Sequence, residues 1–214
     1  MVITWYGQAC FKIQSGDLVL AVDPYSRDIG LTPPRFKSDV LLVTHQHPDH
    51  NNVDSIPEGA FLIEGPGEYE VKGVTVNGIP TFHDNSQGKE RGINTAYLIE
   101  MEGIRLVHLG DYGETKPRPE TIEAFGEVDI LFVPVGGVYT INAAEAAEVV
   151  NTIEPKIVIP MHYGIPGLKV KLEPVETFLK EMGVKNAVPE DRLTIKKKEL
   201  AEDQSTRVVA LKTG

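Results

Sequence analysis

Three histidines and one aspartate are concentrated in six residues of this chain, from His45 to His50. The chain has six histidines in all, so half of them fall in this segment, which follows the apolar stretch 40–43. Imidazole and carboxylate groups bind divalent cations such as zinc. A sharp loop at the end of a strand can direct alternate side chains to one ion and the following pair to another. We therefore interpret residues 45–50 as a metal-binding loop rather than as a chance cluster of a scarce residue.

Other candidate ligands also follow short apolar segments. His83, Asp111 and His162 each lie just after such a segment. Loops gather over the end of a sheet, so side chains that follow different strands can converge there. Asp23 ends a strand in the same way, and we expect it to accept a hydrogen bond or shape a turn rather than bind a metal. His108 lies inside a predicted strand and is interpreted as a packed or hydrogen-bonded residue.

Cysteine usage and charge exclude several classes of protein. The single cysteine, Cys10, cannot form an intrachain disulfide or a CxxC site, so any metal must be held by histidine and carboxylate. The net charge of −10 repels phosphate backbones, which makes nucleic acid an unexpected partner. No apolar run approaches the roughly 18 residues that cross a bilayer, and residues 1–10 lack the basic start of an export signal. We therefore expect a cytoplasmic protein that does not insert into a membrane.

Short apolar runs between turn residues predict β-strands over the first two thirds of the chain. The expected strands are 2–6, 10–14 and 18–22, which should be antiparallel, followed by 39–44, 60–63, 69–79 with a turn at Gly73, 95–100, 104–107, 128–133 and 157–159. Helices are expected at 120–125, 142–151 and 175–182. Asn142 and Glu145 have the spacing of a capping box at the start of the second helix.

The tail, residues 193–211, is predicted to form two strands around the polar turn 202–205. Its lysines 196–198 are interpreted as guards of an exposed edge strand, with a phosphate-binding patch as the alternative. No repeat, linker or break in composition divides the chain. The pattern favours one α/β or α+β domain over 1–214, in which two sheets pack in layers.

The segment 45–50, with its sequence His-Gln-His-Pro-Asp-His, and the later His83, Asp111 and His162 resemble the signature of the metallo-β-lactamase-fold superfamily of metal-dependent hydrolases. The resemblance runs from Asp23 to beyond His162. Segments 109–111, 133–137 and 159–164 are similar to the branch that contains ascorbate-6-phosphate lactonase. This resemblance implies a four-layer αβ/βα sandwich with a two-metal site at one edge of its sheets.

The resemblance also implies a ligand set and a mechanism. His45, His47 and His83 would hold the first ion, Asp49, His50 and His162 the second, and Asp111 would bridge them. The implied cofactors are two divalent ions, with zinc as the default and manganese or iron able to use the same ligands. Two such ions about 3.5–4 Å apart lower the pKa of a shared water, so that a bridging hydroxide serves as nucleophile. Asp49 and Asp111 are therefore the expected catalytic residues. Asp49 would be either a ligand alone or a ligand that also orients the hydroxide.

Substrate contacts are expected in the polar loop 84–92, which follows His83. Lys89 or Arg91 would bind a phosphate or carboxylate, since arginine suits bidentate recognition of anions. The alternative is an ordinary solvated loop. Tyr163, beside His162, is expected either to stabilise an oxyanion or to pack against its loop.

The preferred function is hydrolysis of a small anionic ester, lactone or phosphoester. The expected partner is therefore a small-molecule substrate, which a phosphate group could make anionic. Two alternatives remain. One is a diiron or dimanganese redox or sensing protein on the same fold, and the other is a metal-stabilised binding module without turnover. An open coordination position argues against the binding module, because structural zinc sites are normally closed. The number of subunits is left open.

Overall fold

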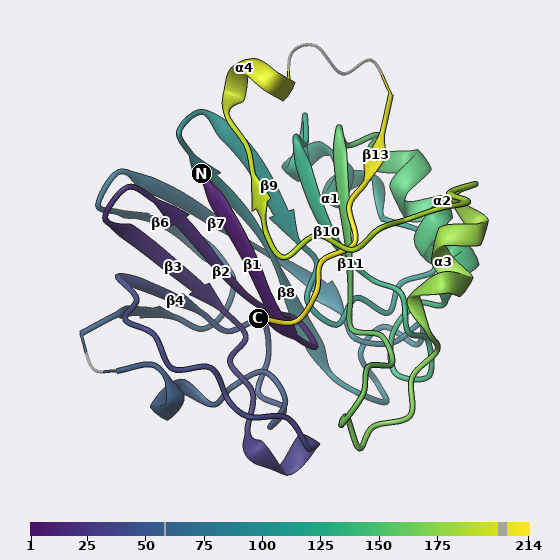
Figure 1. The fold of residues 1–214 in the computed structure, drawn as a ribbon, viewed down its shortest axis with the longest axis horizontal. Coiled ribbons are helices and arrows are strands. Elements are labelled where there is room, and N and C mark those ends of the chain that lie inside the picture. Colours follow the sequence, from purple (N-terminus) through teal and green to yellow (C-terminus); the bar gives the residue numbers. More distant parts are fainter. Residues whose placement is uncertain (58, 201–204) are drawn as a thin grey trace.

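The chain begins with three antiparallel strands, as the sequence predicts. The structure is a computed structural model that describes residues 1–57, 59–200 and 205–214 (Figure 1). Within these residues the first sheet has the order β12-β1-β2-β3-β4-β5, and β4 and β5 join it in parallel. The strands of this sheet are β1 (Val2–Gly7), β2 (Cys10–Ser15), β3 (Leu18–Val22), β4 (Val40–Leu42), β5 (Phe61–Ile63) and β12 (Leu193–Thr194).

A second sheet has the order β13-β11-β10-β9-β8-β7-β6. Its first four strands in the chain form an antiparallel meander, and the last three add to it in parallel. The predicted turn at Gly73 and a second turn at Gly103 connect strands of this meander. The strands are β6 (Gly67–Val71), β7 (Val74–Phe82), β8 (Ile93–Met101), β9 (Ile104–His108), β10 (Ile130–Pro134), β11 (Ile157–Met161) and β13 (Arg207–Val208).

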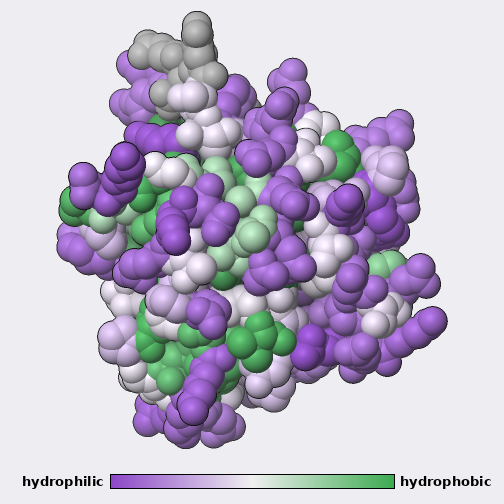
Figure 2. All heavy atoms as spheres, turned by 90° about the vertical axis from the view of Figure 1, so that its right-hand side faces the viewer, coloured by the Kyte–Doolittle hydropathy of each residue, from purple (hydrophilic) through white to green (hydrophobic). Residues whose placement is uncertain are grey.

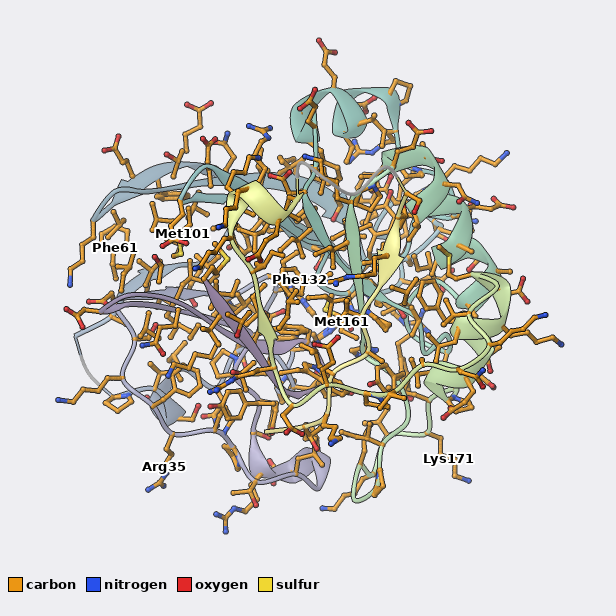
Figure 3. All side chains as sticks on the ribbon, turned by 45° about the horizontal axis from the view of Figure 1, so that its top comes forward. Arg35, Phe61, Met101, Phe132, Met161 and Lys171 are labelled. Atoms are coloured by element: carbon orange, nitrogen blue, oxygen red, sulfur yellow. The ribbon has the colours of Figure 1, made fainter. Side chains whose placement is uncertain are left out.

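The two sheets face each other across one hydrophobic core. Phe11 of β2 and Phe132 of β10 meet with ring centroids 4.6 Å apart. Phe132 and Met161 lie at the centre of the view in Figure 3, whereas Phe61, which is 50% exposed, lies at its edge. Burial of these apolar faces removes them from water and drives the sheets together. The predicted α+β sandwich is confirmed.

The helices between residues 119 and 181 cover the outside of the second sheet (Figure 1). Figure 1 shows α2 and α3 on the right, beside β10 and β11, and the face that carries them is largely hydrophilic, with a hydrophobic area near its lower end (Figure 2). The helices are η1 (Arg27–Ile29), η2 (Val53–Ser55), α1 (Pro119–Phe125), α2 (Ala143–Ile153), α3 (Val175–Glu181) and α4 (Lys197–Leu200). In α2 both hydrogen bonds of the predicted capping box between Asn142 and Glu145 are present. Even this longest helix of the described residues has only 11 residues, too few to cross a membrane.

The tail differs from its prediction. Its two short strands lie in different sheets, since β12 pairs with β1 and β13 with β11. Residues 197–200 form α4 rather than an edge strand, and the Lys196 N–H donates to the Glu199 carboxylate at 3.0 Å. The Lys197 ammonium binds Asp129 at 2.7 Å, so this lysine is neither a strand guard nor part of a free phosphate patch. Residues 202–204 of the predicted turn lie outside the described residues.

Candidate metal centre

The candidate ligands gather because five strands end at one edge of the sandwich. β3 and β4 run in parallel, and so do β9, β10 and β11. β7 has the direction of β9, since both are antiparallel to β8. Parallel strands present their carboxyl ends at the same edge. The segments after β3, β4, β7, β9 and β11 carry, in that order, Asp23, residues 45–50, His83, Asp111 and His162.

Three imidazoles form the first group, which consists of His45, His47 and His83. One ligand atom from each lies within 4.8 Å of the others. The Thr44 hydroxyl donates to Asp23, so His45 must donate its Nδ1 proton to that hydroxyl, 3.0 Å away, and present the lone pair of Nε2 to the group. Burial, with the charge of His50, lowers the pKa of His45 to about 2. Burial also lowers the pKa of His47. The neutral imidazoles of His45 and His47 can therefore accept a cation.

The second group pairs carboxylates with imidazoles and consists of Asp49, His50, Asp111 and His162, again within 4.8 Å. Asp111 Oδ1 lies 3.2 Å from His50 Nε2, and Asp111 Oδ2 lies 3.3 Å from His162 Nε2. Burial opposes ionisation of Asp111, but the facing His162 and His50 outweigh it and hold the pKa of Asp111 well below its ordinary value.

Asp111 also reaches the first group. Its Oδ2 lies 3.2 Å from His83 Nε2 and 4.0 Å from His45 Nε2. One carboxylate thus touches imidazoles of both groups. Its backbone N–H is fixed by the Asn94 side chain at 3.0 Å. This position between the groups is the one that a bridging ligand requires.

Asp23 organises the floor of the site. It is fully buried, with a left-handed backbone at φ 46°. Its carboxylate accepts hydrogen bonds from the Thr44 N–H at 2.8 Å and the Thr44 hydroxyl at 2.7 Å, and it lies 2.8 Å from His50 Nδ1. The proton on His50 Nδ1 is thereby directed to Asp23, which leaves Nε2 to face the second group. This is the carboxylate–histidine arrangement that orients imidazoles in metal sites.

The residues fit divalent ions. His45 Nε2, His50 Nε2 and Asp111 Oδ1 are buried and have no hydrogen-bond partner among the described residues. Buried polar atoms without partners cost about 1–3 kcal/mol each. Cations bound in the two groups would satisfy all three atoms, so the donor set suits metal coordination.

A cavity of about 400 Å³ opens over both groups. Its lining residues are Ile29, His47, Pro48, Asp49, His83, Glu90, Arg91, Asp111, Tyr139, His162 and Val170. A larger cavity of about 650 Å³ lies along α3, but none of its lining residues belongs to either ligand group. We therefore take the smaller cavity as the candidate substrate site.

The predicted substrate contacts separate into three cases. Arg91 lines the cavity, where its guanidinium donates to the carbonyl oxygens of Val138 at 3.3 Å and Tyr139 at 3.5 Å. Lys89 is exposed and does not line this cavity. The Tyr163 hydroxyl donates to the Leu211 carbonyl at 3.4 Å and the ring packs on the core, so the structure does not bring Tyr163 to the cavity.

Two polar residues of the site were missed by sequence reasoning. The buried Asp84 accepts four backbone N–H groups, from residues 86, 88, 90 and 91, and so shapes the loop that carries Arg91. Gln8 contacts ligands of the second group. The position of Asp84 directly after His83 was an available signal, whereas nothing local marks Gln8. His108 packs as expected, with Nε2 donating to the Ala9 carbonyl at 2.9 Å.

Comparison with known proteins identifies the family. Residues 2–162 match the family model of the β-lactamase superfamily domain. A UPF0173 protein of Pyrococcus abyssi is 35% identical over 190 residues, 78% of this chain and 85% of the relative. A UPF0173 metal-dependent hydrolase of Thermococcus onnurineus is 30% identical over 189 residues, 75% of this chain and 84% of the relative.

Solved structures agree. A Thermotoga maritima protein described as a candidate zinc-dependent hydrolase of the metallo-β-lactamase superfamily is 36% identical, with a TM-score of 0.80, over 98% of this chain and 97% of that chain. The predicted superfamily is confirmed, and the branch that contains ascorbate-6-phosphate lactonase stays a prediction. The chain belongs to the β-lactamase superfamily domain family and, with these relatives, to the UPF0173 metal-dependent hydrolases.

Proposed function

We propose that this metal-dependent hydrolase uses two divalent ions, zinc by default, to cleave a small anionic ester, lactone or phosphoester. The observation that carries the proposal is Asp111, which touches imidazoles of both ligand groups at the floor of the cavity. His45, His47 and His83 would hold one ion, Asp49, His50 and His162 the other, and Asp111 both. When bound, such a pair lowers the pKa of water and polarises the bond to be cleaved.

We propose that Asp49, besides binding an ion, orients the attacking water. It lines the cavity, and its side chain is 23% exposed, in contrast to the buried Asp111. Burial opposes ionisation of Asp49, but His50 outweighs it and lowers the pKa of this carboxyl. An ionised carboxylate at the cavity surface can orient water by accepting its hydrogen bond.

Arg91 is the proposed anchor for the anionic group of the substrate. In the described part of the chain its guanidinium donates to backbone carbonyls, not to carboxylates, and it lies 5.3 Å from the centre of the Tyr139 ring. A guanidinium has five N–H donors in a rigid fork, so donors remain for a carboxylate or phosphate. The neighbouring wall contains Ile29, Pro48 and Val170, which suits a substrate with an apolar body.

The test combines metal analysis with a substrate screen. Purified protein is analysed for bound metal, stripped with a chelator, reloaded with zinc and assayed on carboxyl esters, lactones, phosphodiesters and phosphomonoesters. We expect zinc-dependent hydrolysis of an anionic member of one class. Absence of turnover by protein loaded with two ions would favour the binding module, and bound iron with redox-dependent visible absorbance would favour the redox alternative.

The anchor is tested with a pair of variants. Arg91→Ala should raise KM by about 10–100-fold, because a hydrogen bond to a charged group contributes roughly 1.5–3 kcal/mol. Lys89→Ala removes a neighbouring exposed cation and should leave KM unchanged. Equal effects of the two changes would show that the loop attracts the substrate only through its general charge.

A further inference from the structure

The imidazoles of the centre are not all held in the same way. His50 Nδ1 faces Asp23 at 2.8 Å, and His45 Nδ1 faces the Thr44 hydroxyl at 3.0 Å. His162 Nδ1, like His83 Nδ1, is buried and has no hydrogen-bond partner among the described residues. The ring of His162 therefore lacks the outer contact that orients the other two.

Gln8 supplies contacts to His162 from another direction. The backbone carbonyl of Gln8 accepts the His162 backbone N–H at 3.0 Å. The Gln8 side-chain nitrogen lies 3.4 Å from His162 Nε2, the atom that His162 would give to an ion, so this contact belongs to the metal-free centre. The same nitrogen donates to Asp49 Oδ2 at 3.3 Å. One residue thus contacts two candidate ligands that lie far apart in the chain.

Gln8 is itself firmly fixed. It is fully buried, and its backbone carbonyl also accepts the Trp5 indole N–H at 2.9 Å. Its backbone is left-handed, with φ 49°, and His162 opposite has φ 52°. Residues other than glycine adopt this conformation rarely, and they do so where surrounding contacts impose it. The Gln8 amide therefore approaches the ligands from a rigid turn between β1 and β2.

The orientation of the amide has a cost that the fold tolerates. Gln8 Oε1 is buried and has no partner in the described residues, whereas the nitrogen of the same amide faces Asp49 and His162. Buried polar groups are normally paired, and unpaired ones call for an explanation. Orientation of Asp49 provides one, because polar partners of metal ligands set ligand geometry and affinity.

We infer that Gln8 is a positioning residue for the second divalent ion: its side-chain amide holds Asp49 in place, and its backbone carbonyl fixes the backbone of His162. The inference rests on the proposed two-ion function and deepens it. In the described part of the chain the side-chain amide of Gln8 contacts Asp49 and His162 and no residue of the first group, so the effect should be confined to one ion.

The test is a zinc titration of metal-free protein, in which both dissociation constants are measured against a competing chelator. Gln8→Met keeps the length of the side chain and removes its amide. We expect one zinc ion to bind about 10–100-fold more weakly while the other keeps its affinity. Gln46→Met is the matched control, because the exposed Gln46 lies between His45 and His47 but its side chain bonds to Glu64 and Asn51. Neither constant should change in this control.

A measurement on the unaltered protein guards against a variant that fails to fold. The ¹H–¹⁵N resonances of the Gln8 side-chain amide should shift when the second group fills with zinc and remain in place when the first group fills. Two bound ions with unchanged constants in Gln8→Met, or an amide that responds to neither ion, would overturn the role of Gln8 and leave the proposed function standing. A native protein that binds fewer than two zinc ions would overturn both.

Discussion

The two ligand groups differ in charge and in the state of their protons. The first consists of three imidazoles, and burial keeps His45 and His47 from being charged. The second contains two carboxylates beside its imidazoles. Burial opposes a charge on His50, but Asp111, Asp23 and Asp49 outweigh it and raise the pKa of His50 well above its ordinary value. The first group can accept a cation directly, whereas the second must first release a proton.

The groups are alike in exposure, since each has one partly buried ligand. In the first group His47 is only partly buried, and in the second Asp49 alone is partly buried. Both residues line the cavity. Each group therefore offers one ligand to incoming ions and substrate and keeps the rest fixed in the interior. Three substitutions and a change of pH would test the contrast in charge between the two groups.

Removal of Asp111 should have the largest effect, because this carboxylate belongs to both groups. Asp111→Ala leaves His50, His83 and His162 without the anion that faces them. We expect both zinc ions to bind at least about 100-fold more weakly and hydrolysis to be lost. This loss of affinity exceeds the roughly 10–100-fold loss that follows when a residue contacting a ligand, rather than the ligand itself, is replaced. Metal content is measured by elemental analysis after dialysis. Asp191→Ala, which removes an exposed carboxylate, is the control, and unchanged metal content and turnover in Asp111→Ala would refute the bridging role.

Asp23→Asn should separate the groups. The amide of Asn can keep the contact with Thr44, but its NH₂ would face His50 Nδ1 and favour the tautomer with a proton on Nε2. We expect one zinc ion to bind about 10–100-fold more weakly, with the other less affected. Zinc titration checks this result. Equal weakening of both ions would mean that the groups act as one unit.

Acidification should also act on the second group. Below the raised pKa of His50, zinc must displace a proton, so affinity for that ion should fall about tenfold for each unit of pH. The first group should respond less, because the pKa of His45 is about 2. Calorimetry in buffers of different ionisation enthalpy counts the protons released with each ion. Release of the same number with both ions would contradict the proposed difference.

Stability without metal should have the opposite dependence on pH. The pKa of His50 is higher in the folded protein than in the unfolded chain, so protonated His50 stabilises the fold. This stabilisation is complete below the pKa of the unfolded chain and is lost as the pH rises through the pKa of the folded protein. Raising the pH should therefore lower the free energy of unfolding of the metal-free protein while it strengthens zinc binding. Urea denaturation with and without zinc compares the two trends.

The convergence of the centre was predictable because its main signals are local. His83, Asp111 and His162 each follow a strand, and strands of one direction end at one edge. The tail was not predictable in this way. Its strands pair with β1 and β11, far away in the sequence, and the lysines before Glu199 belong to a short helix stabilised by contacts such as Lys197 to Asp129.

Residues whose role comes only from distant contacts escaped sequence reasoning. Gln8 reaches Asp49 and His162 across 41 and 154 positions of the chain. Tyr163 follows a candidate ligand directly, yet its side chain points to Leu211 instead of the cavity. Neighbourhood in sequence fixed the region of the site but not the direction of its side chains. The single domain over 1–214, the cytoplasmic location and the metal identity stay predictions.

Replacement of Cys10 should have the smallest effect on zinc binding and turnover. It tests whether packing of this buried side chain contributes to the difference between the two ligand groups. Cys10 is fully buried beside Tyr25 and Ile29, and burial, together with Asp23, raises the pKa of its thiol well above its ordinary value. A protonated thiol outside the cavity cannot serve as nucleophile. Cys10→Ala should lower the free energy of unfolding of the metal-free protein by about 1 kcal/mol, the cost of a small buried void. Turnover and both zinc constants should be unchanged. A folded, zinc-loaded but inactive variant would overturn water as the nucleophile, whereas selective loss of one zinc ion would mean that packing behind Asp23, and not charge alone, distinguishes the two groups.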